Sequence, residues 1–289
     1  MREFRLSALD GLEISGAVFE AENEKAAVQI IHGEREHKER YYEFAAFLAG
    51  NGCTAVLTDL RGHGESVNAR YFLGHFESFP QLVDDQLKVT DFISQICPGK
   101  EIILYGHSFG SVVARLMLKD NDTRFKKLIM TGATPPSQFA PVRAALCSAA
   151  CSIHHANSVN GYFPSAANNI AGEKLFSNYT ALVDYKSDPM VQSCKLTNAA
   201  VRCTLQANAE LVRIPLHKCA NPALRVLSAY GDDDSLTGGL KGLKKAVSAL
   251  NRDGYSHVFS VFYPTLRHNL LEEGAKEEIF KDIMAFITD

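Results

Sequence analysis

A serine between two glycines is the residue best suited to covalent chemistry in this chain. Ser108 lies in a G-x-S-x-G motif bounded by Gly106 and Gly110. The apolar run 101–105 predicts a strand before it and the pattern of 111–118 predicts a helix after it, which is the context of a nucleophile elbow. Such a tight turn leaves no room for a bulky Cβ at the two glycine positions. We therefore expect an exposed, reactive Ser108 Oγ; a serine that only caps a helix is the alternative.

A serine at its free pKa is a poor nucleophile, so it needs a base, and the base needs an orienting acid. Three carboxylates, Asp232, Asp233 and Asp234, follow the predicted strand 223–230, and His268 follows the last predicted strand. The alternative is that the three aspartates only form a solvated acidic turn. With Ser108 upstream, the chain has the order serine, acid, histidine of a hydrolytic triad.

The elements that must position these residues alternate between strand and helix. The first two predicted strands form an antiparallel hairpin, and the later ones are expected to be parallel because right-handed helical crossovers connect them. The result is an α/β fold with a mostly parallel eight-stranded sheet, whose ligand crevice lies at the carboxyl ends of the strands. The predicted strands are 3–6, 12–19, 26–31, 54–57, 101–105, 127–131, 223–230 and 257–262, and the main predicted helices are 41–51, 82–96, 111–118, 240–251 and 276–287.

The alternation stops near Pro135 and resumes near Asn221. This divides the chain into a core, 1–134 and 222–289, and an insertion, 135–221, that we expect to be a helical cap above Ser108. Most large apolar residues of the insertion are expected to pack onto the core and some to line an acyl pocket. They include Phe139, Leu146, Ile153, Tyr162, Phe163, Leu175 and Phe176.

Composition excludes several classes of function. With 289 residues, 46% hydrophobic, 22% charged and a net charge of −3, the chain is an ordinary globular protein with no electrostatic reason to bind nucleic acid. Its seven cysteines form no C-x-x-C pair, and it has no G-x-G-x-x-G or P-loop motif, so we expect no metal and no cofactor. Neither a signal peptide nor an apolar membrane span is recognisable, so a cytoplasmic protein is expected.

Three further segments carry a resemblance to a known family. Residues 32–41, HGEREHKERY, are similar to HG-x-x-EH-x-x-RY; residues 59–66, DLRGHGES, are similar to D-x-RGHG-x-S; and residues 266–273, LRHNLLEE, are close to a histidine loop. Together with the elbow they resemble the α/β-hydrolases of the monoacylglycerol lipase/lysophospholipase group, which includes proteins labelled serine aminopeptidases. The resemblance implies the α/β-hydrolase fold and places the catalytic acid at Asp234.

The resemblance also implies an oxyanion hole. Its donors are the backbone N–H of Phe109, at the start of a helix, and that of Glu34, the residue after His32-Gly33. Gly33 lets the backbone approach the tetrahedral oxygen, and Arg61 and His63 are expected to brace this loop, unless 61–64 is only a glycine-rich turn. The Glu34 carboxylate opposes a nearby negative charge unless it points outward, to Arg35 or Arg61. It is expected to narrow the acyl pocket or to disfavour anionic substrates.

The sequence therefore predicts a serine hydrolase that cleaves carboxylic esters through an acyl-enzyme. Monoacylglycerols, lysophospholipids or other short-to-medium acyl esters are the expected small-molecule substrates, with transient contact between the cap and a lipid surface. The alternatives are an aminopeptidase or amidase of the same fold, and a catalytically silent hydrolase-fold binding protein.

Overall fold

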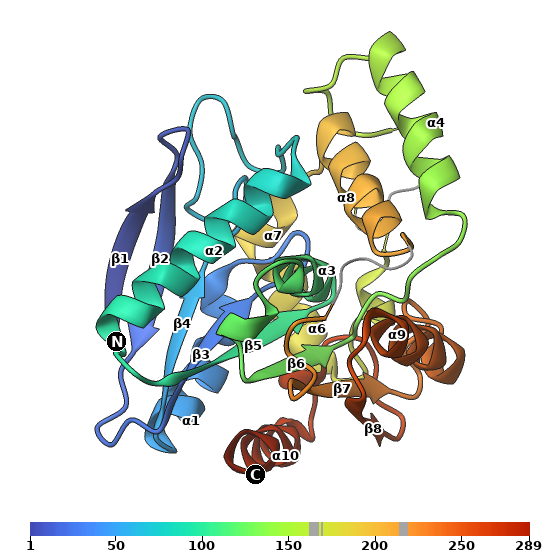
Figure 1. Cartoon of the computed structure of the whole chain (residues 1–289). Helices are drawn as coiled ribbons and strands as arrows, with labels where there is room; N and C mark the ends of the chain where they lie inside the picture. Colours follow the sequence, from blue (N-terminus) through green and yellow to red (C-terminus); the bar gives the residue numbers. More distant parts are fainter. Residues whose placement is uncertain (162–167, 169, 214–218) are drawn as a thin grey trace.

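The eight strands of the computed structural model form one sheet in the order β1-β2-β4-β3-β5-β6-β7-β8 (Figure 1). The structure describes residues 1–161, 168, 170–213 and 219–289. β1 pairs antiparallel with β2 and β2 antiparallel with β4, and all later pairs are parallel. The predicted α/β-hydrolase fold is thereby confirmed. The strands are β1 Arg2–Ser7, β2 Glu13–Phe19, β3 Ala26–Ile31, β4 Cys53–Thr58, β5 Glu101–His107, β6 Lys127–Thr131, β7 Arg225–Gly231 and β8 His257–Tyr263.

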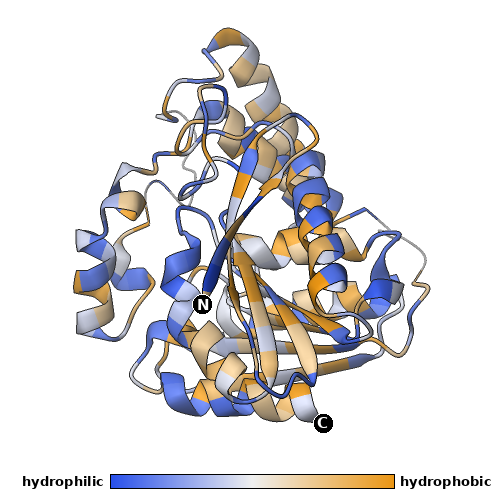
Figure 2. Ribbon diagram, turned by 90° about the vertical axis from the view of Figure 1, so that its left-hand side faces the viewer, coloured by the Kyte–Doolittle hydropathy of each residue, from blue (hydrophilic) through white to orange (hydrophobic). Residues whose placement is uncertain are grey.

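Helices cover both faces of this sheet and bury two apolar clusters. The helices α2 (Phe79–Ile96), α3 (Phe109–Leu118) and α9 (Gly239–Asp253) pack on one face, and α1 (Tyr42–Gly50) and α10 (Lys276–Thr288) on the other (Figure 1). β3 and β4 are buried along their whole length, as expected of parallel strands covered on both sides. Figure 2 shows the hydrophobic colours concentrated on these central strands, whereas β1, at the N-terminus, is largely hydrophilic. Short 3-10 helices lie at Lys38–Tyr41, Asp122–Arg124 and Leu270–Glu272.

Strand register brings the loops that matter to one edge of the sheet. The last residue of β3, Ile31, pairs with Gly106, and His107 pairs with Thr131 at the end of β6. The loops after β3, β5 and β6 therefore begin side by side at the carboxyl ends of the strands. Gly231, the last residue of β7, pairs with Tyr263, the last residue of β8, which places two further loops at the same edge.

The described part of the insertion between β6 and β7 is built from helices. They are α4 Ala140–Ile153, the 3-10 turn Gly172–Lys174, α6 Tyr179–Ser187, α7 Pro189–Ser193 and α8 Asn198–Glu210. The Asp188 side chain accepts hydrogen bonds from the N–H groups of Met190 and Val191 and so caps α7, which has a proline at its first position. None of the helices that the structure describes is long and apolar enough to cross a membrane.

The expected burial of the large apolar residues of the insertion is only partly right. Leu175 and Phe176 are buried, but Phe139, Leu146 and Ile153 are 73%, 60% and 83% exposed. The helix α4 packs against α8 through small buried residues, so its large side chains have no place in that interface. These small residues are Ala140, Ala144 and Cys147. Leu146 lines the cavity beside Ser108, as expected of some of the large apolar residues, whereas Ile153 and Phe139, which precedes α4, do not. The predicted positions Tyr162 and Phe163 lie outside the described residues.

Candidate active site

The turn between β5 and α3 holds Ser108 in a strained backbone conformation. Its φ is +50° and its ψ is −117°, in a region that residues with a side chain rarely adopt. A Cβ on Gly106 would lie 2.7 Å from the Gly110 oxygen, and one on Gly110 would lie 2.2 Å from the oxygen of Ile31. Both glycines of the motif are therefore required by contact, because α3 starts directly against the end of β3.

Three side chains from three loops form one hydrogen-bonded chain. His268 Nε2 lies 2.8 Å from Ser108 Oγ, and His268 Nδ1 lies 2.8 Å from Asp234 Oδ2. The other oxygen of Asp234 accepts the N–H groups of Leu236 at 2.9 Å and Thr237 at 3.2 Å. Burial opposes ionisation of Asp234, yet the adjacent His268 ring and these backbone donors lower the pKa of the carboxyl below its ordinary value. The arrangement matches the geometry of a serine–histidine–acid triad.

The two neighbouring carboxylates point elsewhere. Asp232 accepts the N–H of Thr265, and Asp233 pairs with Arg267 at 3.0 Å on the surface. Neither makes a hydrogen bond to His268 among the described contacts. Of the three consecutive aspartates, the structure thus brings only Asp234 to the histidine.

The two backbone N–H groups predicted to bind an oxyanion both belong to segments beside Ser108. Phe109 is the first residue of α3, and the first N–H groups of a helix lack intrahelical acceptors. A Cβ on Gly33 would lie 3.2 Å from Ser108 Cβ, so the segment that carries the Glu34 N–H passes directly beside the nucleophile. The N–H of Gly33 itself is fixed by Glu36 Oε2 at 2.8 Å.

Histidines, rather than Arg61, connect this loop to the loop after β4. His32 Nε2 accepts the N–H of Leu60 at 2.9 Å, so its Nδ1 is the protonated nitrogen and donates to the Gly33 carbonyl at 2.7 Å. The ring of His63 packs on that of His32 with centroids 5.3 Å apart. Burial lowers the pKa of His32 to about 4 and that of His63 to about 3, so both rings are neutral at pH 7.

The expectation that Arg61 braces the oxyanion loop is wrong. Its guanidinium donates to Asp85 at 2.9 and 3.0 Å and to Asp10 at 2.6 Å, and it stacks over Tyr71. Arg61 therefore ties the loop after β4 to α2 and to the turn between β1 and β2. A buried guanidinium needs carboxylate partners, and here Asp85 and Asp10 supply them.

Of the two possibilities for the Glu34 side chain, the structure shows no hydrogen bond to Arg35 or Arg61 among the described contacts and places the carboxyl toward α8. The hydroxyl of Thr204, on α8, donates to Glu34 Oε1. Arg35, at a φ of +59°, instead donates from Nε to the Cys194 carbonyl at 2.9 Å. Glu34, Ser108 and His268 all line one cavity of about 410 Å³ between the core and the insertion.

Supporting residues that the sequence analysis did not single out surround the triad. The buried Glu36 carboxylate accepts Gly33 N–H, the Tyr41 hydroxyl at 2.7 Å and Asn269 Nδ2 at 3.0 Å, and so joins the oxyanion loop to the residue after His268. Gly132, at a φ of +52°, leaves room for the histidine, since a Cβ there would lie 2.9 Å from the His268 ring. The HG-x-x-E spacing was the only available signal for Glu36.

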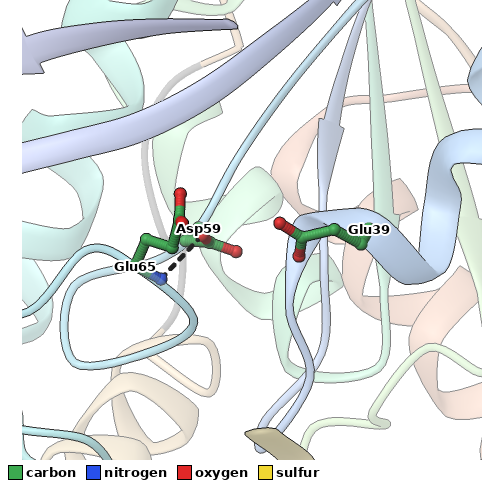
Figure 3. Close-up of side chains that lie close together, drawn as sticks. All are labelled: Glu39, Asp59 and Glu65. Atoms are coloured by element: carbon green, nitrogen blue, oxygen red, sulfur yellow. Dashed lines mark hydrogen bonds between the residues drawn. The ribbon is translucent and has the colours of Figure 1, made fainter.

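A second group of carboxylates lies outside the cavity. Glu39, Asp59 and Glu65 offer oxygens within 4.8 Å of one another, and Figure 3 shows them converging from the helical turn after β3 and the loop after β4. The ammonium of Lys38 donates to all three, at 2.7, 2.9 and 3.1 Å. Because the buried Lys38 supplies the positive charge, the group is an ion cluster, buried at Lys38 and Asp59 and open to solvent at Glu65, that fastens the two loops together.

The fold and the position of these residues define the class. A mostly parallel eight-stranded sheet with Ser108 on the turn after β5, Asp234 after β7 and His268 after β8 is the α/β-hydrolase arrangement. Residues 22–275 match the family described as serine aminopeptidase, S33. The chain belongs to this family.

Named relatives include lipases of the same fold. The chain is 29% identical to monoglyceride lipase of Mus musculus over 58% of its own length and 52% of that protein, so the match spans about half of the mouse enzyme. It is 24% identical to the monoglyceride lipase homolog of Monkeypox virus over 91% of this chain and 89% of that protein. A thermostable carboxyl esterase from Bacillus coagulans superposes with a TM-score of 0.86 and 17% identity, covering 99% of this chain and 97% of the esterase, which shows the shared fold.

Proposed function

We propose that this protein is a serine hydrolase that cleaves carboxylic esters through an acyl-enzyme. The observation that carries the proposal is the continuous hydrogen-bonded chain Ser108–His268–Asp234 at the wall of a cavity of about 410 Å³. Nucleophile, base and orienting acid lie within the 2.6–3.2 Å reach that proton transfer requires.

In the proposed mechanism, His268 Nε2 takes the proton of Ser108 Oγ as the oxygen attacks the ester carbonyl. The N–H groups of Phe109 and Glu34 stabilise the tetrahedral oxyanion. The protonated His268 then donates to the departing alcohol, and the acyl group remains on Ser108. A water molecule, deprotonated by His268, attacks the acyl-enzyme and releases the carboxylic acid, with Asp234 holding Nδ1–H throughout.

The proposed substrates are monoacylglycerols, lysophospholipids or other acyl esters. Much of the cavity wall is apolar, which suits a hydrocarbon chain. The apolar lining residues include Leu146, Ile170, Leu175, Leu196, Val201, Leu205 and Leu236. A relative named monoglyceride lipase, 29% identical, and one named monoglyceride lipase homolog, 24% identical, support the same class. The family description, serine aminopeptidase, keeps aminoacyl amides as the second candidate.

Ser108→Ala tests the mechanism. We expect the loss of p-nitrophenyl ester turnover by ~10⁴–10⁶-fold in kcat and the loss of labelling by a fluorophosphonate. Ser94→Ala, on the exposed side of α2, is the matched control and should keep both. Labelling that persists at another serine contradicts the assignment, and an unlabelled wild-type protein supports the silent binding protein instead.

A substrate panel tests the class of ester. It should contain p-nitrophenyl esters of increasing acyl length, a monoacylglycerol, a lysophospholipid and aminoacyl amides, compared by kcat/KM. Preference for an ester is the expected result. Preference for an aminoacyl amide over every ester contradicts the lipid-ester proposal and leaves the triad intact.

A further inference from the structure

The cavity beside Ser108 contains a carboxyl group that the proposed mechanism does not use. Only the backbone N–H of Glu34 enters the oxyanion hole, whereas its side chain extends into the cavity toward α8. Oε1 accepts the Thr204 hydroxyl, and Oε2 accepts no hydrogen bond within the described part of the chain. One oxygen of this carboxyl is therefore available to a ligand in the cavity.

The surroundings of this carboxyl make an unmatched oxygen costly. Of the other α8 residues that line the cavity around Thr204, Val201 and Leu205 are apolar and Asn208, one turn further on, is polar. Burial raises the pKa of Glu34 to about 7, although the Thr204 hydroxyl and the charge of Arg35 act in the opposite direction. Glu34 is only partly buried, so Oε2 is open to the cavity until a ligand fills it. A ligand that covers this oxygen without supplying a donor leaves a buried polar atom unpaired, which costs more free energy than a typical hydrogen bond returns, so ligands that supply a donor are favoured over those that do not.

We propose that Glu34 is a selectivity-determining residue, whose carboxyl accepts a hydrogen bond from a hydroxyl or ammonium group of the bound ester and excludes esters that place a carboxylate or phosphate there. This inference rests on the proposed ester hydrolase function. It narrows the substrate class to acyl esters that carry a donor group close to the scissile bond, in the acyl or in the alcohol part, because Glu34 follows the glycine that lies against Ser108.

The charge of Glu34 makes this selectivity depend on pH. Below pH 7 most of the carboxyl is neutral, and above pH 7 most of it is charged. Raising the pH through about 7 should thus favour ammonium esters and disfavour carboxylate esters relative to neutral ones. Among the described residues, the other charged or titratable groups near it are Arg35, Glu36, Arg143, His107, Tyr185 and His268 around the cavity and Cys194 and Cys203 beside it.

These neighbours do not titrate in a way that imitates the effect. Arginines stay protonated, and burial raises the pKa of both cysteine thiols and of the Tyr185 hydroxyl above their ordinary values. Burial lowers the pKa of His107 to about 4, and although burial opposes it, neighbouring charged groups lower the pKa of Glu36 to about 2. Protonation of His268 changes the turnover of every ester alike. It therefore cancels when two esters are compared as a ratio of kcat/KM in one variant at one pH.

The test uses two sets of esters of matched size. In the first, the leaving group is p-nitrophenol and acyl chains of about three to eight carbons end in methyl, ammonium or carboxylate. In the second, the acyl group is constant and the alcohol carries methyl, hydroxyl, ammonium or carboxylate. The ratio of kcat/KM for the ammonium ester to that for the methyl ester should rise about tenfold or more between pH 6 and pH 8 in at least one set. The ratio for the carboxylate ester should fall over the same range.

Three variants separate Glu34 from other causes. Glu34→Gln should make both ratios independent of pH, because the amide does not ionise. Thr204→Val removes the hydroxyl that stabilises the charged form and should move the midpoint of the wild-type curve to higher pH. Glu43→Gln, which removes an exposed carboxylate paired with Lys276, is the matched control and should leave the wild-type curve unchanged.

Ratios that do not change with pH in either ester set overturn the inference, as does a pH dependence that survives in Glu34→Gln. If Glu34→Gln does not fold, the shifted midpoint in Thr204→Val supports the inference, and an unshifted one contradicts it. Failure of the underlying hydrolase function is distinguishable, because then even the methyl esters are not cleaved by the wild-type protein.

Discussion

Replacing Asp234 by asparagine changes one atom in the centre of the site, and the structure fixes which way the new amide must face. Asp234 Oδ1 accepts two backbone N–H groups, from Leu236 and Thr237, and Oδ2 faces His268 Nδ1 at 2.8 Å. The asparagine oxygen must accept the two backbone N–H groups, because an NH₂ group in that position would place hydrogen-bond donors against donors. The amide nitrogen then faces Nδ1, so the imidazole has to accept at Nδ1 and carry its proton on Nε2.

A histidine in that tautomer cannot take the proton of Ser108. Holding the wrong tautomer costs a serine hydrolase ~10⁴ in kcat, or ~5.5 kcal/mol of transition-state stabilisation. We expect a loss of this size for Asp234→Asn in p-nitrophenyl ester hydrolysis, with binding less affected than turnover. Because a neutral amide has about the same volume as the buried carboxylate that it replaces, we expect the variant to fold. Circular dichroism and a thermal melt check this.

The neighbouring aspartates provide the controls. Asp233 pairs with Arg267 on the surface and its side chain is 60% exposed, and exposed pairs contribute ~0–1 kcal/mol. Asp233→Asn and Asp232→Asn should therefore keep kcat within about twofold of the wild type. Similar, mild losses from all three substitutions refute the reasoning and mean that the orienting acid is another residue.

Other changes test the supporting structure. Gly132→Ala should lower kcat at least ~10-fold, because its Cβ would lie 2.9 Å from the His268 ring; wild-type kcat rules out this steric role. Arg61→Met should cost ~3–5 kcal/mol of unfolding free energy in urea, since it strands buried Asp85, while a loss below ~1 kcal/mol contradicts a buried ion pair. Although partial burial opposes it, hydrogen bonds from Arg61 lower the pKa of Asp10 to about 2. Asp10→Asn should therefore cost ~1 kcal/mol of unfolding free energy at pH 7 after solvent screening. The difference in stability between wild type and variant should vanish as the pH falls from about 4 through 2.

Much of the core was predictable because its signals are local. The strand-turn-helix pattern around Ser108 is written in the residues directly before and after the motif, although Gly110 is required by a contact with distant Ile31. The apolar runs of β3 and β5 report burial on both faces. The order of Ser108, Asp234 and His268 along the chain also constrains where the loops lie, because parallel strands end at one edge. The choice of Asp234 over Asp233 came from a family motif rather than from the residues alone.

The contacts that the sequence could not reveal are long-range polar ones. Nothing local indicates that Glu34 meets Thr204 across 170 positions, or that Arg61 turns to Asp10 and Asp85. The outward apolar side of α4 was also missed, because periodicity marks an amphipathic helix without saying which side has a partner. Here the small residues, and not the large ones, form the packed side.

The fastening of the loop after β3 to the insertion has a consequence for protein engineering. Within a few residues, Glu34 bonds to Thr204, Arg35 to the Cys194 carbonyl, and His37 to Asp188 at 2.7 Å. The insertion occupies one continuous stretch between β6 and β7, so it looks like a module that can be exchanged to alter substrate range. A chimera made by swapping that stretch alone would lose the partners that hold the loop after β3 in place. Grafts should therefore transfer residues 34–37 together with 188–204, as a matched pair of segments.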